Sequence, residues 1–231
     1  YQKFPSIQVA VDADRKNGIE QLVAQDAPPQ LILLDDAFQH RRVKAGFYIL
    51  LTAYDDLFAD DFLLPTGNLR ESRKGAQRAD VIVVTKCPTT LSTDEQNHIK
   101  QRINRYSKAS VYFSRITYED AVYSKTTSIS VLEIQHSDCV LLAGIAKPAS
   151  FFNHLKNNKS LCLTYPDHHH FSDSDLLEIK QKAGSKRIIT TEKDYVRLED
   201  SILQDQLFYL PIKTSFITDS DEFDANILDF V

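Results

Sequence analysis

The chain has 231 residues, of which 42% are hydrophobic and 26% charged, and its formal net charge is −5. These values exclude a disordered protein, which would contain fewer apolar residues, and they argue against a general nucleic-acid-binding protein, which would be basic. No stretch is apolar over the roughly eighteen residues that a membrane-spanning helix needs. The three cysteines, Cys87, Cys139 and Cys162, lie far apart and predict small buried side chains rather than a disulfide framework or a zinc site.

The chain begins at Tyr1 and contains no methionine. The initiator methionine is normally removed only before a small residue, so Tyr1 is not expected to follow a translation start. We therefore expect an internal or C-terminal part of a longer protein, with some of its machinery upstream of Tyr1.

Short apolar runs alternate with amphipathic segments along the chain. Continuous apolar runs of this kind are typical of strands covered on both faces of a parallel sheet. We predict strands at 7–11, 31–34, 47–51, 81–85, 111–113, 139–144, 161–164, 187–190 and 208–210. Helices are predicted after Ser92 and Ser172, each with the spacing of a capping box, and at 147–156, after Thr191 and at 221–230. This alternation predicts the α/β class, with ligand sites at the carboxyl ends of the strands.

The strand–helix alternation is interrupted once, at residues 112–135, which are rich in Thr, Ser and Tyr. This segment predicts extended linker strands, and the alternation resumes at Cys139. We therefore predict two α/β lobes, residues 1–117 and 118–231.

The first segment whose residues suggest a chemical role is the run Leu31–Leu34, which leads directly into Asp35 and Asp36. A buried strand that ends in a carboxylate is a Walker-B arrangement, in which an Asp holds Mg²⁺ beside a nucleotide phosphate. A helix N-cap with a solvated acidic pair is the simpler alternative. Gln39, His40 and Arg41 follow within one turn and favour the functional interpretation.

The second segment is the turn around Pro65 and Gly67, which is followed by Asn68, Arg70 and Arg73. Arginine suits phosphate because its guanidinium group can bond two oxygens at once. Taken alone, however, these residues are better explained as an ordinary surface turn before a helix.

Two further segments lie in the C-terminal half. His168, His169 and His170 stand in a row, and adjacent side chains cannot all face one metal ion, so a zinc site is disfavoured. One of them could be a general base or its partner, or the loop could simply be solvated. Thr191 and Asp194 have capping-box spacing, which explains them without a ligand.

None of the six glycines lies in a G-x-x-x-x-G-K-[ST] or G-x-G-x-x-G motif. A Walker-B-like strand without such a phosphate-binding loop is half of a nucleotide site. We expect the missing loop to precede Tyr1.

Taken together, six segments resemble one family, the tetraacyldisaccharide 4′-kinases, and occur in the same order. They are Asp35–Arg41 (DDAFQHR), Leu64–Glu71 (LPTGNLRE), Arg78–Thr85 (RADVIVVT), Leu142–Pro148 (LAGIAKP), Pro166–His168 (PDH) and Thr191–Asp194 (TEKD). The set spans nearly the whole chain and is specific in combination, although each piece alone is not.

The resemblance implies a kinase that transfers the γ-phosphoryl group of ATP, with Mg²⁺, to the 4′-hydroxyl of a tetraacylated glucosamine disaccharide 1-phosphate in lipid A biosynthesis. It implies a P-loop-NTPase-like lobe, here incomplete, and a second Rossmann-like α/β/α lobe, joined by linker strands. It also implies a place at the cytoplasmic face of the inner membrane of Gram-negative bacteria, reached through an N-terminal hydrophobic helix. Without its phosphate-binding loop, this chain alone is expected to be inactive.

The resemblance also assigns roles to residues. Asp35 and Asp36 would serve Mg²⁺ and catalysis, and His168 would support an Asp base that lies upstream. Residues expected to contact substrate or phosphate are Gln39, His40, Arg41, Asn68 and Arg70. Ala37 stands where the family usually has glycine, so the turn must avoid a left-handed conformation there.

Two other functions remain open at this stage. A metal-dependent phosphohydrolase would use Asp35, Asp36 and the loop His168–His170 as ligands. A non-catalytic Rossmann-like module would bind a sugar nucleotide or a partner protein.

Overall fold

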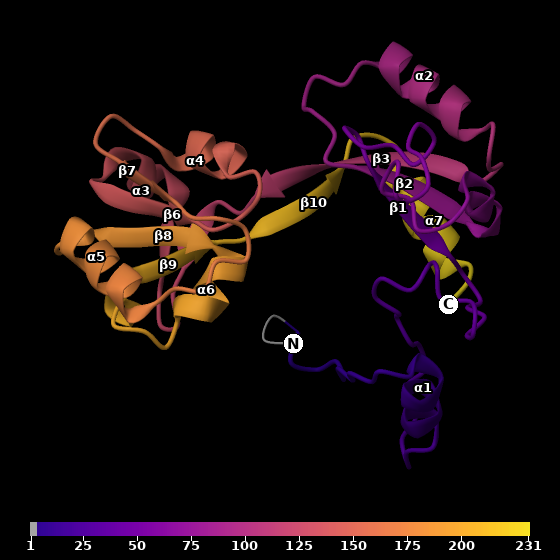
Figure 1. Ribbon diagram of the computed structural model, residues 1–231, viewed down its shortest axis with the longest axis horizontal. Helices are drawn as coiled ribbons and strands as arrows, with labels where there is room; N and C mark the ends of the chain where they lie inside the picture. Colours follow the sequence, from indigo (N-terminus) through magenta and orange to yellow (C-terminus); the bar gives the residue numbers. More distant parts are fainter. Residues whose placement is uncertain (1–3) are drawn as a thin grey trace. The chain divides into compact units, whose positions relative to one another are not determined.

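The computed structural model describes residues 4–231. The chain divides into two compact units, Tyr1–Arg115 with Phe216–Val231, and Ile116–Ser215. The strands β3 (Ser110–Tyr118) and β10 (Ile212–Phe216) are hydrogen-bonded neighbours and carry the chain out of the first unit and back to it (Figure 1).

The first unit contains a sheet in which β1 (Ile49–Ala53), β2 (Val81–Thr85) and β3 run parallel. Its helices are α1 (Arg15–Val23), the 3₁₀ helix η1 (Arg73–Arg78), α2 (Thr93–Ile103) and α7 (Ser220–Leu228). Ser92 caps α2, and the predicted capping box with Glu95 is confirmed. Ile82 and Val84 of β2 pack against Ile99 and Ile103 of α2, which fixes the helix on the sheet.

Two predicted strands of this unit are wrong. Residues 7–11 and 31–34 have no strand conformation. The side chains of 7–11 are solvent-exposed, with Val11 at 97%, and those of 31–34 alternate between exposed and half-buried, with Leu33 at 86%. A strand needs a neighbour that completes its backbone hydrogen bonds. Among the described residues no strand pairs with either segment. An apolar run shows that a segment is suited to burial but not which strand it pairs with.

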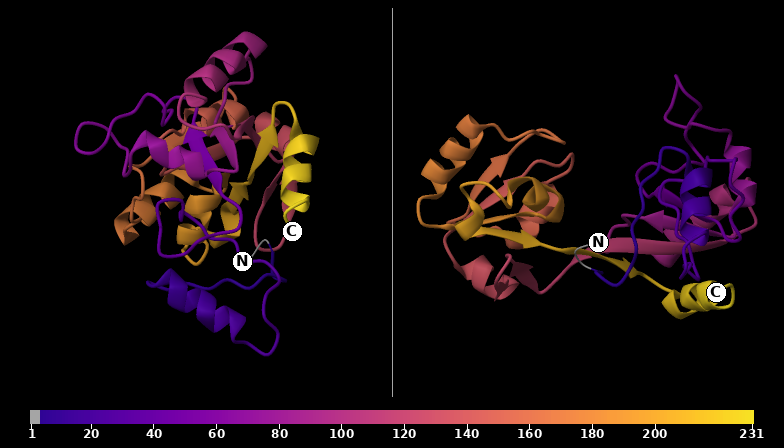
Figure 2. Two further views of the ribbon diagram at one scale, coloured as in Figure 1. Left: turned by 90° about the vertical axis from the view of Figure 1, so that its right-hand side faces the viewer. Right: turned by 90° about the horizontal axis from the view of Figure 1, so that it is seen from below.

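The second unit is built on a six-stranded sheet of order β5-β4-β9-β8-β6-β7. The four strands β6 (Cys139–Ala143), β7 (Leu161–Thr164), β8 (Arg187–Thr191) and β9 (Leu207–Leu210) are parallel, and β4 (Ala121–Tyr123) and β5 (Ser128–Ser130) complete the sheet antiparallel. The helices are α3 (Val131–His136), α4 (Ala149–Leu155), α5 (Asp173–Ala183) and α6 (Glu192–Leu198), with the short 3₁₀ helix η2 (Gln204–Gln206) (Figure 2).

Alternating residues of β6 build the two cores of this unit. Leu141 packs with Phe151 and Leu155 of α4, whereas Val140 and Leu142 pack with residues of α5 and α6. Both faces of the sheet are therefore covered by helices, which confirms the predicted α/β class. The predicted capping box at Ser172, the N-cap of α5, is confirmed as well.

The observed division of the chain differs from the predicted one at the C-terminus. The first crossing lies at Arg115 and Ile116, close to the predicted 117/118 boundary, but residues 216–231 belong to the first unit. Phe223 of α7 packs edge-to-face on Tyr112 of β3, with ring centroids 5.4 Å apart. The prediction assigned this segment to the second lobe because it follows that lobe in sequence.

In the described part of the chain, no helix has both the length and the apolar character needed to cross a bilayer.

Candidate active site

The acidic turn of the first unit holds Asp35 and Asp36, directly after the apolar segment 31–34. Asp36, and not Ala37, has a positive φ, of 43°, so the turn avoids a left-handed conformation at Ala37 as predicted. Arg15 donates to the backbone carbonyls of Asp35 and Asp36 at 3.4 and 3.2 Å. Both aspartates are exposed to solvent, where their carboxylates can accept a ligand.

Two predicted site residues lie against the carboxylate of Asp36. Gln39 Nε2 is 3.4 Å from Asp36 Oδ1, and Arg70 Nη1 is 3.8 Å from Asp36 Oδ2. Arg70 reaches this position from the following loop, whose backbone is anchored by Asp61. The Asp61 carboxylate accepts from the backbone N–H of Asn68 at 3.0 Å. Any side chain at Gly67 would collide with Asp61 and with the backbone of Phe62, so this turn requires glycine.

Glu71 joins the two loops, although the residue pattern alone assigns it no role. Its carboxylate accepts from Arg41 at 3.0 Å and from Arg78 at 2.6 and 3.2 Å. Burial would raise the pKa of Glu71, but the hydrogen bonds and charges of Arg78 and Arg41 outweigh it and hold that pKa below its ordinary value. Glu71 is therefore ionised at neutral pH and fixes both guanidinium groups. The signal in the sequence that would have identified Glu71 is its position as a carboxylate between two segments that contain arginine.

The predicted residues therefore separate into two neighbouring groups. Asp36, Gln39 and Arg70 lie together at the acidic turn. His40 and Arg41 line an adjoining cavity. Asn68 contributes its backbone N–H to the loop that carries Arg70.

The acidic turn suits a magnesium ion on the chemistry of its donors. Mg²⁺ is usually held by one or two carboxylates, with water and substrate phosphates in the remaining positions. Asp35 and Asp36 supply such a pair of exposed carboxylates. Within the described residues no group of three or more His, Cys, Asp or Glu side chains is placed to hold a metal ion.

The second unit brings charged groups around His168. Its ring nitrogen Nε2 lies 3.2 Å from Lys193 Nζ, and Nδ1 lies 3.3 Å from Arg197 Nη2. Lys193 also donates to Asp167 at 3.0 Å, and this hydrogen bond holds the pKa of Asp167 below its ordinary value. His168 has a φ of 59°, an uncommon conformation for a residue with a side chain. Lysine and arginine offer only donors, and a neutral imidazole has one acceptor nitrogen, so His168 can accept a hydrogen bond from Lys193 or from Arg197 but not from both at once.

Asp194 is linked to this cluster through its ion pair with Arg197. It is fully buried, and its carboxylate accepts from Gly144 N and Thr191 Oγ1, both at 2.8 Å, and from Arg197 at 3.3 Å. The predicted cap is half right, because Thr191 Oγ1 accepts from Asp194 N at 3.2 Å while the carboxylate reaches across to the loop after β6. A Cβ atom at Gly144 would lie 3.1 Å from Asp194 Oδ1, which explains the glycine there.

The neighbouring histidines do not join His168. His169 is 3.1 Å from Asp175 in α5.

The fold has a counterpart among solved structures. LpxK from Aquifex aeolicus, solved in complex with ATP, aligns with a TM-score of 0.59 over 84% of this chain and 56% of that chain, at 22% identity. The aligned part of this chain thus has the same mixed α/β fold as that structure.

Sequence comparison defines the family. A family model described as tetraacyldisaccharide-1-P 4′-kinase (LpxK) matches residues 1–231. The tetraacyldisaccharide 4′-kinase of Flavobacterium johnsoniae is 59% identical over the whole chain, and that of Bacteroides thetaiotaomicron is 39% identical. The chain spans 68% and 67% of these two relatives. It belongs to the tetraacyldisaccharide 4′-kinase family.

Proposed function

We propose that the protein acts as a kinase that transfers the γ-phosphoryl group of ATP to the 4′-hydroxyl of a tetraacylated glucosamine disaccharide 1-phosphate. The observation that carries this proposal is the match of the family model over the whole chain. The contacts of Gln39 and Arg70 with the Asp36 carboxylate support it. The proposal includes a place in lipid A biosynthesis at the cytoplasmic face of a Gram-negative inner membrane.

The residues of the first unit would position charge around the transferring group. Asp35 and Asp36 would hold Mg²⁺, which when bound neutralises the negative charge of the phosphate oxygens. Arg70, whose side chain is 69% exposed, is free to turn its guanidinium group toward a phosphoryl oxygen. Gln39 orients the Asp36 carboxylate through its amide.

His168 would support removal of the proton from the acceptor hydroxyl. We expect His168→Ala to lower kcat by about a hundredfold or more, the usual contribution of a general base and its support. His170→Ala is the matched control, because that ring is exposed in the same loop, and its kcat should stay close to that of the unaltered protein. An equal loss of kcat in the two variants would show that the loop tolerates no substitution, and would contradict the role assigned to His168.

The experiment for the whole proposal follows label from γ-labelled ATP into lipid. The protein expressed from its complete coding sequence is incubated with the tetraacyldisaccharide 1-phosphate, and mass spectrometry locates the new phosphate. We expect phosphorylation at the 4′ position. Release of inorganic phosphate from ATP or from the lipid, with no transfer, would instead support the phosphohydrolase.

A further inference from the structure

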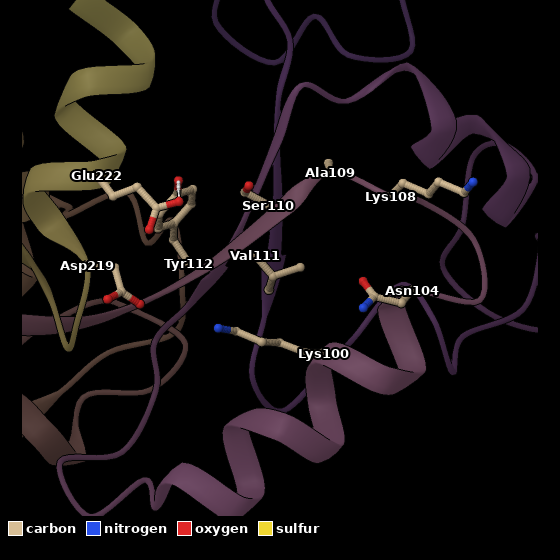
Figure 3. A pocket seen from close by; sticks show the side chains of 9 residues that line it. All are labelled: Lys100, Asn104, Lys108, Ala109, Ser110, Val111, Tyr112, Asp219 and Glu222. Carbon is tan, nitrogen blue, oxygen red and sulfur yellow. Dashed lines mark hydrogen bonds between the residues drawn. The ribbon is translucent and has the colours of Figure 1, made fainter.

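A pocket of about 220 Å³ lies in the first unit between the end of α2, the start of β3 and the start of α7 (Figure 3). Ser110, which lines it, is the first residue of β3 and pairs in register with Val81, the first residue of β2. Ligands of α/β sheets usually bind at the opposite, carboxyl ends of the strands. No residue assigned to phosphoryl transfer lines this pocket, so it is a separate candidate site.

The pocket carries two charges of each sign, on different sides. Lys100 and Lys108 come from α2 and the loop after it, whereas Asp219 and Glu222 come from the start of α7 (Figure 3). Among the described residues no ion pair joins either lysine to either carboxylate. Opposite charges attract more strongly as they approach, and here the pocket holds them apart. A ligand with one positive and one negative group would meet both sides at once.

The carboxylate of Glu222 is held in place by a buried tyrosine. Tyr112, which is 3% exposed, donates from its hydroxyl to Glu222 Oε1 at 3.2 Å and accepts from Asn226 at 2.7 Å. Burial, and then the charge of Glu222, raise the pKa of Tyr112. The phenol therefore stays protonated at neutral pH and keeps Glu222 at the pocket.

Asp219 stands at the N-cap of α7, but its side chain makes no capping hydrogen bond. An N-cap aspartate normally accepts from a backbone N–H of the first turn. Asp219 has a φ of 60°, and the one side-chain hydrogen bond of its carboxylate among the described residues is from the Thr218 hydroxyl at 3.1 Å. This carboxylate faces the pocket instead of the helix end, where it can accept from a bound ammonium group.

The opposite side of the pocket offers hydrogen-bond donors. The ammonium group of Lys100 lies 5.7 Å from the centre of the Phe113 ring, close enough for a cation–π contact that limits its movement. Asn104 follows Lys100 by four residues, so its amide lies on the same face. Lys108 is exposed, and its flexible stem lets its ammonium group turn toward a bound anion. Two ammonium groups and an amide suit a phosphate, which has more acceptor oxygens than a carboxylate.

We propose that this pocket binds a small zwitterion in which an ammonium group and a phosphate group are joined by a short linker, as in phosphoethanolamine. The phosphate lies at Lys100 and Lys108, and the ammonium group lies at Asp219 and Glu222. The volume of about 220 Å³ is below that of pockets for drug-sized ligands, roughly 300–1,000 Å³, and fits so small a molecule. The same chemistry occurs in free phosphoethanolamine and in the headgroup of a phospholipid. The proposal does not depend on the kinase reaction.

The test is isothermal titration calorimetry of the protein expressed from its complete coding sequence. The probes are O-phosphoethanolamine and glycerophosphoethanolamine, with ethanolamine and inorganic phosphate as the two separate halves. We expect at least one zwitterion to bind about tenfold or more tightly than either half, because only a zwitterion engages both sides of the pocket.

Variants locate the binding. Lys100→Gln and Asp219→Asn should each weaken binding of the zwitterion about tenfold, since each removes a charge-assisted hydrogen bond. Asparagine tolerates the left-handed backbone of position 219, so the fold of that turn is kept. Arg105→Gln and Asp221→Asn are the controls, because they remove the same charges from the same two segments but do not line the pocket. Their affinities should stay within about twofold.

The two zwitterions distinguish the sources of the ligand. Tighter binding of glycerophosphoethanolamine would assign the pocket to a phospholipid headgroup, and tighter binding of O-phosphoethanolamine would assign it to the free compound; either result supports the site. Three results would overturn it. They are no heat of binding at about 10 mM zwitterion, equally tight binding of ethanolamine or phosphate alone, and unchanged affinity in both Lys100→Gln and Asp219→Asn. The first two use the unaltered protein, so they decide the question even where a variant fails to fold.

Discussion

Asp36→Asn is expected to lower kcat about a thousandfold in the transfer of phosphate from ATP to the lipid acceptor. The change removes one negative charge from the acidic turn but preserves the shape of the side chain. A metal ion beside a transferring phosphate is worth several kcal/mol, and each loss of about 1.4 kcal/mol lowers the rate tenfold. Turnover by the variant should recover in part as the Mg²⁺ concentration rises, since an amide oxygen is a weaker ligand than a carboxylate.

The control for this variant is Asp26→Asn, an exposed aspartate of the same unit without a partner among the described residues. It removes the same charge and should leave kcat within about twofold, as expected for a surface substitution. Circular dichroism of both variants would show whether the fold is preserved. If the Asp36→Asn protein is folded and retains full turnover, Asp36 has no role in the active site. The kinase function itself would still be decided by the transfer experiment.

The sequence predicts those parts of the fold that depend on neighbouring residues. The strands at 81–85 and 161–164 have the predicted bounds, and the capping boxes at Ser92 and Ser172 form as predicted. Each of these features is determined within a few residues. The segments 7–11 and 31–34 have the same apolar composition but no strand beside them among the described residues, and composition carries no information about a pairing partner.

The site shows the same limit. Residues 35–41 are contiguous, so their pattern alone indicates a charged turn. The contacts that organise the site cross long separations. Arg78 reaches Phe38 over 40 residues, and Arg197 reaches His168 over 29 residues. The carboxylate of Asp194 lies 50 residues from Gly144, and a local pattern explains Asp194 equally well as part of a helix cap.

Asp194→Ala is expected to destabilise the second unit by about 3–5 kcal/mol, the usual cost of removing one partner of a buried ion pair. The fully buried carboxylate serves three donors, Gly144 N, Thr191 Oγ1 and Arg197. Its loss leaves the buried Gly144 N–H without an acceptor and removes the acceptor of the half-buried Thr191 hydroxyl. Asp194→Asn keeps one side-chain oxygen, so its cost should be lower, about 1–3 kcal/mol.

Native-state amide hydrogen exchange can assign this loss to one unit, because each amide reports the local free energy of opening. We expect faster exchange at the buried strand residues Leu141 and Ile189 of the second unit, and unchanged exchange at Val83 of the first. Asp200→Ala is the control, since that carboxylate is 87% exposed in its ion pair with Lys125 and should cost less than about 1 kcal/mol. Unchanged exchange at Leu141 in Asp194→Ala would show that the carboxylate does not hold the loop after β6. Faster exchange there would show that the carboxylate holds this loop. Asp194 also holds Arg197, which in turn contacts His168, so the stability of this unit and the position of the histidine depend on the same buried carboxylate.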